Sequence, residues 1–590
     1  MRELKFFYAL ALMTVVAASL CACSANQMNK SADLGVAPAP VTFSGSYLAG
    51  RFAQQNGDWN AAQKYMGDAL AYDAGNAGLM QRTFLLAVGS GDFATARDLA
   101  ARMIAAAQNK GSTQNKGISR AQARNGDTDA LALIFMACDA IGRHDYKGAL
   151  AFLDPLPSTG FGAYTKPMLT AWARIGLKDT SGAFKALSGS LSPDSPTYAM
   201  YEGLMDELSG NMNAAADDYK AAISGGLSLN EAVLTASFFA RYGEPEISAQ
   251  IYHQLSALYP YNPYIHAMEH GDPMRVIPPN ISSAADGAAI AMYDLASVLY
   301  ARHAYDSAQI YGNLVALLSP SSPFAHMMQG DIAALHGQYP AAIADYNAIA
   351  PASPVYWIAQ VRLTEVYETA GQTDKAIAML TAMEKNPFAR TAALVSLGDT
   401  YRRHQRYADA VGAYTQALAA SPRVTKDEWP VLYARGMAES RLGQWDAAQK
   451  DLTAALAFQP DNPMILNFLA YSWATKGVNL DKALAYAKQA VSLRPDDGYI
   501  LDSYGWTLFR LAHYKQAVVW LKQAVAQVPD DTTLLDHLGD AYWESGDHLA
   551  ARSQWRHARA VSQDASFRAL VAQKIAHGIA VPSELSSSAP

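Results

Sequence analysis

The chain has 590 residues, and its 46 Lys and Arg against 53 Asp and Glu leave a formal net charge of −7. A mildly acidic chain without a basic stripe argues against nucleic acid as the main partner. The length exceeds what one globular core usually holds, but an array of repeats has no such limit because each unit contacts only its neighbours.

The N-terminus has the pattern of an export signal. Arg2 and Lys5 precede an apolar run at 6–20 that is too short for a comfortable membrane span. The next residues, Leu-Cys-Ala-Cys at 20–23, resemble a bacterial lipobox, which implies a signal peptide at 1–22 and acylation, including palmitate, on Cys23. Ser24 resembles an outer-membrane sorting signal. We therefore expect a lipoprotein anchored in the bacterial outer membrane and facing the periplasm, with ordinary signal cleavage near this point as the alternative.

The cysteine count agrees with this interpretation. Once the signal peptide is removed and Cys23 is acylated, Cys138 is the one thiol left in the sequence. It lies in the apolar run 131–141, where a buried structural cysteine is expected. An exported chain with one thiol has no disulfide framework, so its stability must come from helix packing.

The rest of the N-terminal half divides by composition. Residues 23–42 are small, polar and proline-containing, which predicts a flexible tether. A degenerate helical array follows at 43–260, interrupted at 108–127 by a polar stretch that predicts a surface loop or a disordered insertion. Five prolines between 260 and 279 make 261–286 the candidate linker to a second array at 287–565.

The clearest pattern in the chain is a unit of about thirty-four residues that returns five times in phase between 390 and 565. The prolines that end the first four units, at 422, 460, 495 and 529, are 38, 35 and 34 residues apart. Counted with Leu394 at position 4, four of the five units have apolar residues at positions 4, 7 and 11, which form the buried stripe of a first helix, and the second unit has Leu432 at position 4. The proline cannot continue a helix, so the chain turns and restarts.

Small residues recur at two other positions of the unit. They stand at position 8 (Gly398, Gly436, Ala470, Gly505, Gly539) and, as alanine, at position 20, where two helices are expected to cross at roughly 8–10 Å. The third unit has one extra residue before its second helix, so its positions from 20 onward are counted after that insertion. Position 24 of the second helix is bulky in four of the five units and position 27 is small. This pattern resembles the tetratricopeptide repeat.

The resemblance implies an all-α fold, a right-handed superhelical solenoid of about fourteen helix pairs divided into two sub-arrays. Residues 566–578 resemble the solvating helix that ends such arrays, and the polar tail 579–590 predicts disorder.

In this family, positions 2, 5, 9, 12 and 13 face the concave side, where partners bind. In the last three repeats these positions contribute aromatic, amide and acidic groups of the kind expected in a binding groove. The candidate groove residues are Asn467, Tyr471, Tyr499, Asp502, Trp506, Phe509, Arg510, Asp536, Asp540 and Trp543, with Glu544 beside them. The alternative for Trp506 and Trp543 is packing against a neighbouring helix.

The charges at these positions indicate which kind of peptide the groove favours. The carboxylate clamp of some relatives needs several Lys, Arg and Asn residues, whereas Asn467 and Arg510 here stand among Asp502, Asp536 and Asp540. A peptide C-terminal carboxylate is therefore disfavoured, and amide-rich or basic segments fit better.

One motif suggests an enzyme. His266, Glu269 and His270 match the H-x-x-E-H pattern of some zinc peptidases. Prolines on both sides of the motif leave barely two helical turns, and no third ligand is evident. We expect neither catalysis nor a cofactor.

The lipobox and repeats together resemble bacterial outer-membrane lipoproteins that act as adaptors. Some of these recruit a carboxyl-terminal processing protease and deliver peptidoglycan hydrolases to it. The sequence thus predicts a non-enzymatic protein-binding scaffold. Three hypotheses stay open: a protease adaptor, a structural scaffold of an envelope polysaccharide or secretion assembly, and, least favoured, a zinc peptidase.

Overall fold

The computed structural model describes residues 42–111, 120–259, 262–269, 281–386, 389–420 and 428–579. The predicted signal peptide, the acylation site Cys23, nearly all of the predicted tether and the tail beyond residue 579 lie outside these ranges, as does His270.

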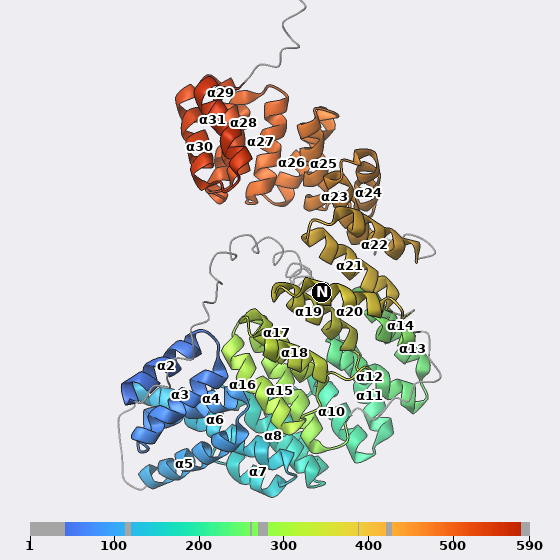
Figure 1. The fold of residues 1–590 in the computed structure, drawn as a ribbon. Helices are drawn as coiled ribbons and strands as arrows, with labels where there is room; N and C mark the ends of the chain where they lie inside the picture. The colour runs from blue at the N-terminus through green and yellow to red at the C-terminus, as the bar shows by residue number, and fades with distance from the viewer. Residues whose placement is uncertain are drawn as a thin grey trace, which may run out of the picture. The chain divides into compact units, whose positions relative to one another are not determined.

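Within the described ranges the secondary structure is helical, as the repeat pattern predicts, and it comprises thirty helices (Figure 1). Twenty-six of them form thirteen packed pairs of successive helices, and the other four are α6, α7, α14 and α31. The chain divides into two compact units, residues 1–136 and 137–590.

The first unit holds the helices up to the middle of α6. They are α2 (Phe43–Gln55), α3 (Trp59–Tyr72), α4 (Ala77–Ser90), α5 (Phe93–Gly111) and α6 (Arg120–Gly142). Helix α6 begins at Arg120, so the second part of the loop predicted at 108–127 is helical. Cys138, near the end of α6 in the second unit, is fully buried, which confirms the expected structural cysteine. Burial raises the pKa of its thiol far above the ordinary value.

The second unit continues with α7 (Tyr146–Leu153), α8 (Gly162–Gly176), α9 (Thr180–Leu187), α10 (Pro196–Ser209), α11 (Met212–Ile223), α12 (Leu229–Tyr242), α13 (Pro245–Leu258), α14 (Pro263–Glu269), α15 (Ala284–Ala301), α16 (Tyr305–Leu318), α17 (Pro323–Leu335), α18 (Tyr339–Ala348), α19 (Tyr356–Thr369) and α20 (Thr373–Met383). The five in-phase repeats follow as α21 (Arg390–Arg403), α22 (Tyr407–Ala419), α23 (Trp429–Arg441), α24 (Trp445–Phe458), α25 (Pro463–Lys476), α26 (Leu480–Leu493), α27 (Gly498–Arg510), α28 (Tyr514–Gln527), α29 (Thr532–Glu544), α30 (His548–Val561) and the single helix α31 (Ala565–His577).

Helix α15 packs against α8 and α10 within the second unit, although more than a hundred residues separate it from α8 along the chain. Trp172 of α8 is fully buried, and a Cβ at Gly287 of α15 would lie 2.3 Å from its ring. Tyr201 of α10 donates a hydrogen bond to Asp294 of α15. Helices α8, α10 and α15 therefore pack together within the second unit, although the predicted linker at 261–286 lies between α10 and α15 in the sequence.

The repeat pattern coincides with the core. All five alanines at position 20 (Ala410, Ala448, Ala483, Ala517, Ala551) and all five residues at position 24 (Tyr414, Leu452, Ala487, Leu521, Trp555) are fully buried. Helix pairs from α21 to α30 stack in chain order (Figure 1). The turns that precede α25, α27 and α29 are built alike, since Asn462, Asp497 and Asp531 each follow a proline by two residues and cap the next helix with a side-chain oxygen.

Gly398 and Gly412 offer a matched pair of substitutions within one repeat. A Cβ at Gly398 would lie 2.4 Å from the Tyr414 ring, whereas a Cβ at the exposed Gly412 would meet nothing within 4 Å. Gly398→Ala should lower the free energy of unfolding by about 1–3 kcal/mol through overpacking. Gly412→Ala should raise it by about 0.5–1 kcal/mol because alanine favours a helix. Urea unfolding of both variants measures the difference, and equal effects would contradict this account of position 8.

Candidate binding pocket in the C-terminal repeats

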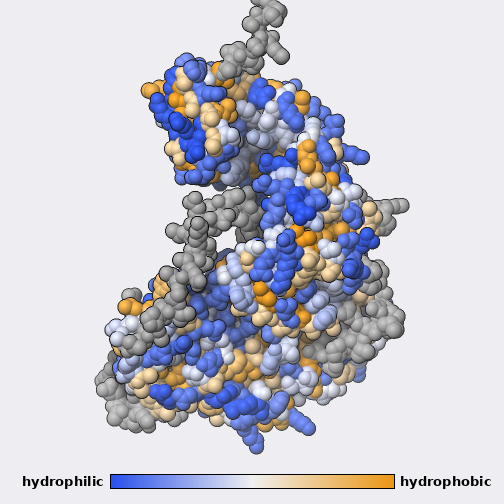
Figure 2. All heavy atoms as spheres, in the orientation of Figure 1, coloured by the Kyte–Doolittle hydropathy of each residue, from blue (hydrophilic) through white to orange (hydrophobic). Residues whose placement is uncertain are grey.

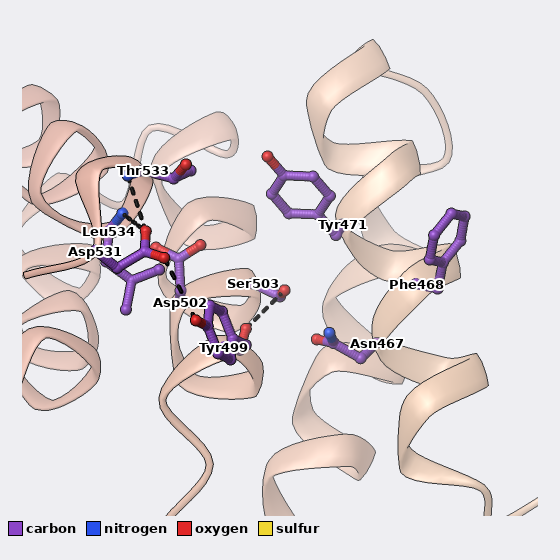
Figure 3. A pocket seen from close by; sticks show the side chains of 9 residues that line it. All are labelled: Asn467, Phe468, Tyr471, Tyr499, Asp502, Ser503, Asp531, Thr533 and Leu534. Atoms are coloured by element: carbon purple, nitrogen blue, oxygen red, sulfur yellow. Dashed lines mark hydrogen bonds between the residues drawn. The ribbon is translucent and has the colours of Figure 1, made fainter. Parts of the chain in front are cut away.

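A pocket of about 220 Å³ lies among the first helices of three successive repeats (Figure 3). It is lined by Asn467, Phe468 and Tyr471 of α25, by Tyr499, Asp502 and Ser503 of α27, and by Asp531, Thr533 and Leu534 at the start of α29. Four predicted groove residues, at positions 5 and 9 of one repeat and 2 and 5 of the next, thus line one cavity. Figure 3 shows Asn467 and Tyr471 of α25 directed toward the side chains of α27 and α29, with Phe468 farther from them.

The floor on the α27 and α29 side is held by hydrogen bonds. Asp531 Oδ1 accepts from the backbone N–H groups of Thr533 and Leu534 at 2.8 and 3.1 Å, which caps α29. The Tyr499 hydroxyl donates to Asp531 Oδ2 at 3.4 Å. On the opposite wall Asn467 Oδ1 is buried without a hydrogen-bond partner in the described part of the chain. The pocket therefore combines a fixed carboxylate with an unsatisfied acceptor.

Asp502 is paired with a histidine that the sequence analysis did not single out. His537 Nδ1 lies 3.0 Å from both carboxylate oxygens of Asp502, and His537 is 7% exposed. The Trp506 ring stacks on the imidazole at 4.0 Å between centroids. His537 occupies position 6, which does not belong to the family's groove pattern. The sequence feature that could have pointed to His537 is Asp502, an acidic residue at position 5 of the preceding repeat.

The electrostatics of His537 are set by opposing effects. Burial, the largest contribution, lowers its pKa, but the charge and hydrogen bond of Asp502 and the charges of Asp536 and Asp540 together raise it above the ordinary value. The imidazolium form is therefore more favoured than in an ordinary histidine, and where it is present it neutralises part of the negative charge beside the pocket.

The remaining predicted residues of α27 lie beside the pocket rather than in its lining. Phe509 stacks on Trp506 at 4.8 Å between ring centroids. Arg510 donates to the Thr475 carbonyl of α25 at 2.7 Å, and its guanidinium lies 6.0 Å from the Trp506 ring. Trp506 therefore contacts the neighbouring helix α29, as the packing alternative expected, although its indole Nε1 is buried without a hydrogen-bond partner among the described residues.

The predicted residues of α29 are engaged by the last helix of the array. Lys574 of α31 donates to both carboxylate oxygens of Asp536 and of Asp540, with distances between 2.8 and 2.9 Å. Burial and the neighbouring Asp536 charge raise the pKa of Asp540 to about 6, although Lys574 opposes that shift. Trp543 stacks on His548 at 4.0 Å and lies 5.5 Å from Trp555. Positions 5, 9 and 12 of this repeat are thus filled from within the chain.

The H-x-x-E-H motif lies partly on the short helix α14. Glu269 accepts a hydrogen bond from His253 of α13 at 2.6 Å, with the tautomer of that ring taken as protonated at Nδ1. His266 Nδ1 lies 3.8 Å from Glu269. In the described ranges, which exclude His270, no group of three His, Cys, Asp or Glu side chains is placed to hold a metal ion.

Two family models match the second unit. Residues 319–432 match a model described as "Tetratricopeptide repeat-like domain", and residues 433–498 match one described as "Tetratricopeptide repeat". Residues 319–498 are therefore similar in sequence to tetratricopeptide repeats. The pocket begins in the α25 helix of this matched segment and continues into α27 and α29, which extend the same repeat pattern in sequence.

A similar protein of known sequence is a TPR repeat-containing protein of Pseudomonas aeruginosa. It is 29% identical over 187 residues, which cover 32% of this chain and 31% of the relative. The match therefore spans less than a third of either protein, and it supports the presence of tetratricopeptide repeats rather than a shared activity.

The solved structures that match include an APC/C hetero-tetramer of Cut9 and Hcn1, with 14% identity, 90% of this chain and 96% of that chain covered, and a TM-score of 0.36. A tetratricopeptide repeat protein of Parabacteroides merdae has 15% identity, 44% and 98% coverage and a TM-score of 0.34. With TM-scores this low, neither structure carries an argument about this chain. Among the helices that the structure describes, none has the length and hydropathy needed to span a bilayer.

The Asp502–His537 pair predicts a pH-dependent stability. Below the ordinary histidine pKa near 6.5, His537 is protonated in both folded and unfolded chains, and the stabilisation from its raised folded pKa is fully present. This stabilisation is lost as the pH rises through the folded pKa. The advantage of wild type over His537→Gln in thermal unfolding should therefore be largest near pH 6 and shrink at alkaline pH.

Asp502→Asn serves as the matched control for this measurement. It keeps a side chain of the same shape but removes the charge that favours the imidazolium. In the Asp502→Asn background the effect of His537→Gln should lose most of its pH dependence. A His537→Gln effect that is constant with pH in the wild-type background would rule out the ion pair.

The Lys574 contacts predict how α31 is held. Its side chain is 15% exposed, and those of Asp536 and Asp540 are 13% and 10% exposed. Lys574→Met should destabilise the docking of α31 by about 3 kcal/mol, because it leaves two adjacent carboxylates without their cation. Hydrogen–deuterium exchange of the α31 amides should accelerate accordingly. Arg568→Met, at an exposed site on the same helix, should leave exchange unchanged, and equal exchange in the two variants would contradict the prediction.

Proposed function

We propose that the protein is a non-enzymatic, lipid-anchored scaffold that faces the periplasm and holds a segment of a partner protein in its C-terminal repeats. Tetratricopeptide repeats mediate protein–protein interactions, and this coarser role rests on the family matches. The pocket between α25, α27 and α29 is the single observation that supports a specific binding place.

The composition of the surface supports selective rather than broadly apolar recognition. On the face drawn in Figure 2, hydrophilic residues cover much of the described surface and hydrophobic ones are interspersed among them. A large continuous apolar patch would favour non-selective association. The pocket instead has aromatic walls with carboxylate, amide and hydroxyl groups between them, a combination suited to recognising a polar side chain on an extended segment.

The finer proposal is an adaptor that brings envelope substrates to a carboxyl-terminal processing protease. Its support is the lipobox at 20–23 together with a long repeat array. The competing proposal, a structural scaffold of a polysaccharide or secretion assembly, places the protein in the same compartment with different partners.

The adaptor proposal predicts a pocket-dependent set of partners. Mild crosslinking in cells, purification and mass spectrometry should recover a protease together with cell-wall hydrolases from wild type. Tyr471→Ala should lose at least one of the two, because it removes an aromatic wall of the pocket. Leu549→Ala, which truncates a side chain that is 79% exposed on α30, is the matched control and should recover both. Recovery of polysaccharide or secretion components instead would favour the scaffold.

The same cells test the anchor. Cys23→Ser removes the only predicted acylation site and should move the protein from the membrane fraction to the soluble fraction. If Cys23→Ser fractionates with membranes as wild type does, the lipoprotein assignment is wrong even where the partner results hold.

A further inference from the structure

We infer that the pocket between α25, α27 and α29 receives a lysine or arginine side chain from an extended segment of a partner protein. This inference deepens the proposed function and rests on it, because it specifies the chemistry of the segment that the scaffold holds. Four kinds of observation carry it: the charges of the lining, the state of Asp531, the contacts of Lys574 at the same repeat positions two repeats further on, and the aromatic walls.

The lining is rich in hydrogen-bond acceptors and negative charge. Among its nine residues are the carboxylates of Asp502 and Asp531 and the amide of Asn467, and none of the nine is Lys or Arg. Asn467 Oδ1 is buried and unsatisfied in the described structure. A buried acceptor without a donor is costly, and a cationic side chain with several N–H groups would satisfy it.

Asp531 is the carboxylate best placed to receive that cation. Asp502 already faces His537, whereas within the described ranges Asp531 makes no ion pair with a Lys, Arg or His side chain. Its contacts are the two backbone N–H groups that it caps and the Tyr499 hydroxyl. The helix cap fixes the position of the carboxylate, so little conformational entropy is lost when a ligand binds.

The chain itself places an ammonium at the same repeat positions two repeats further on. Asp536 and Asp540 stand at positions 5 and 9 of α29, and Lys574 Nζ lies within 2.9 Å of oxygens from both. Positions 5 and 9 of α25 are Asn467 and Tyr471, which line the pocket. Positions 5 and 9 thus bind a lysine of the chain itself in α29, whereas in α25 the same two positions line a pocket that contains no Lys or Arg.

The walls suit a cation as well. Phe468 and Tyr471 stand on one side of the pocket and Tyr499, which is 45% exposed, on the other (Figure 3). An ammonium or guanidinium close to such rings gains cation–π attraction, and the aliphatic stem of the side chain packs on the aromatic faces. An acidic side chain in the same place would meet two carboxylates and gain neither interaction.

The experiment uses the purified full chain and a library of short random peptides in which one central position is fixed in turn as lysine, arginine, glutamine, leucine or glutamate. We expect the lysine and arginine pools to be retained most strongly. Asp531→Asn should weaken the binding of a retained lysine peptide roughly three- to tenfold, as expected for the loss of one charge pair. Asparagine caps a helix about as well as aspartate, so α29 should keep its stability, which thermal unfolding verifies.

Asp530→Asn is the matched control, because it removes the same charge from the neighbouring residue, which pairs with His557 outside the pocket. It should leave peptide affinity unchanged. Equal losses in the two variants would show attraction to the acidic chain as a whole and would overturn the inference.

Two outcomes separate this inference from the proposed function. Retention of the glutamate or leucine pool, abolished by Tyr471→Ala, would overturn the cationic ligand but keep the pocket as a protein-binding site. If Tyr471→Ala changes the retention of no pool, both the inference and the proposed binding place are wrong.

Discussion

The fold of the C-terminal repeats depends on one close contact within each helix pair. At position 8 the first helix has a glycine, and at position 24 the second helix places a bulky side chain over it. A Cβ at Gly398, Gly436, Gly505 or Gly539 would lie 2.3–3.0 Å from Tyr414, Leu452, Leu521 or Trp555. The third repeat has Ala470 and Ala487 at the two positions. What the contact limits is therefore the combined volume of the two facing side chains. The first helices α25, α27 and α29 also contact one another in succession, and positions 5 and 9 of α25 line one pocket with positions 2 and 5 of α27.

This contact explains why so much of the local fold could be predicted from sequence. The buried stripe, the small residues and the prolines recur at fixed spacing, and each has its effect within one repeat or its neighbour. The packing of α15 on α8 has no such signature. It depends on Trp172 of one repeat covering Gly287 of another that lies more than a hundred residues away, and no periodicity reports a contact of that kind.

The candidate site shows the same limit at smaller scale. Asn467, Tyr471, Tyr499 and Asp502 could be placed together from the repeat register alone, and the pocket contains them. His537 and Lys574 could not, because their importance arises from charge partners rather than from repeat position. Asp536 and Asp540 have the composition of groove residues, yet α31 supplies their cation. Register predicts which side of a helix a residue faces, but the partner that it meets there depends on the tertiary packing.

The acidic residues of these first helices therefore differ in the cation, if any, that neutralises their charge. At the C-terminal end, Lys574 binds Asp536 and Asp540 and holds α31 against the array. One repeat earlier, Asp502 has a histidine whose charge depends on pH. In the pocket, Asp531 at the start of α29 makes no ion pair with a cationic side chain of the described structure, and Asn467 Oδ1 of α25 accepts no hydrogen bond there. Lys574 thus fills the acidic site of the last repeat, whereas the pocket between α25, α27 and α29 is left for a partner. Because helices pack on both sides of this pocket, its walls are held in position before a partner binds.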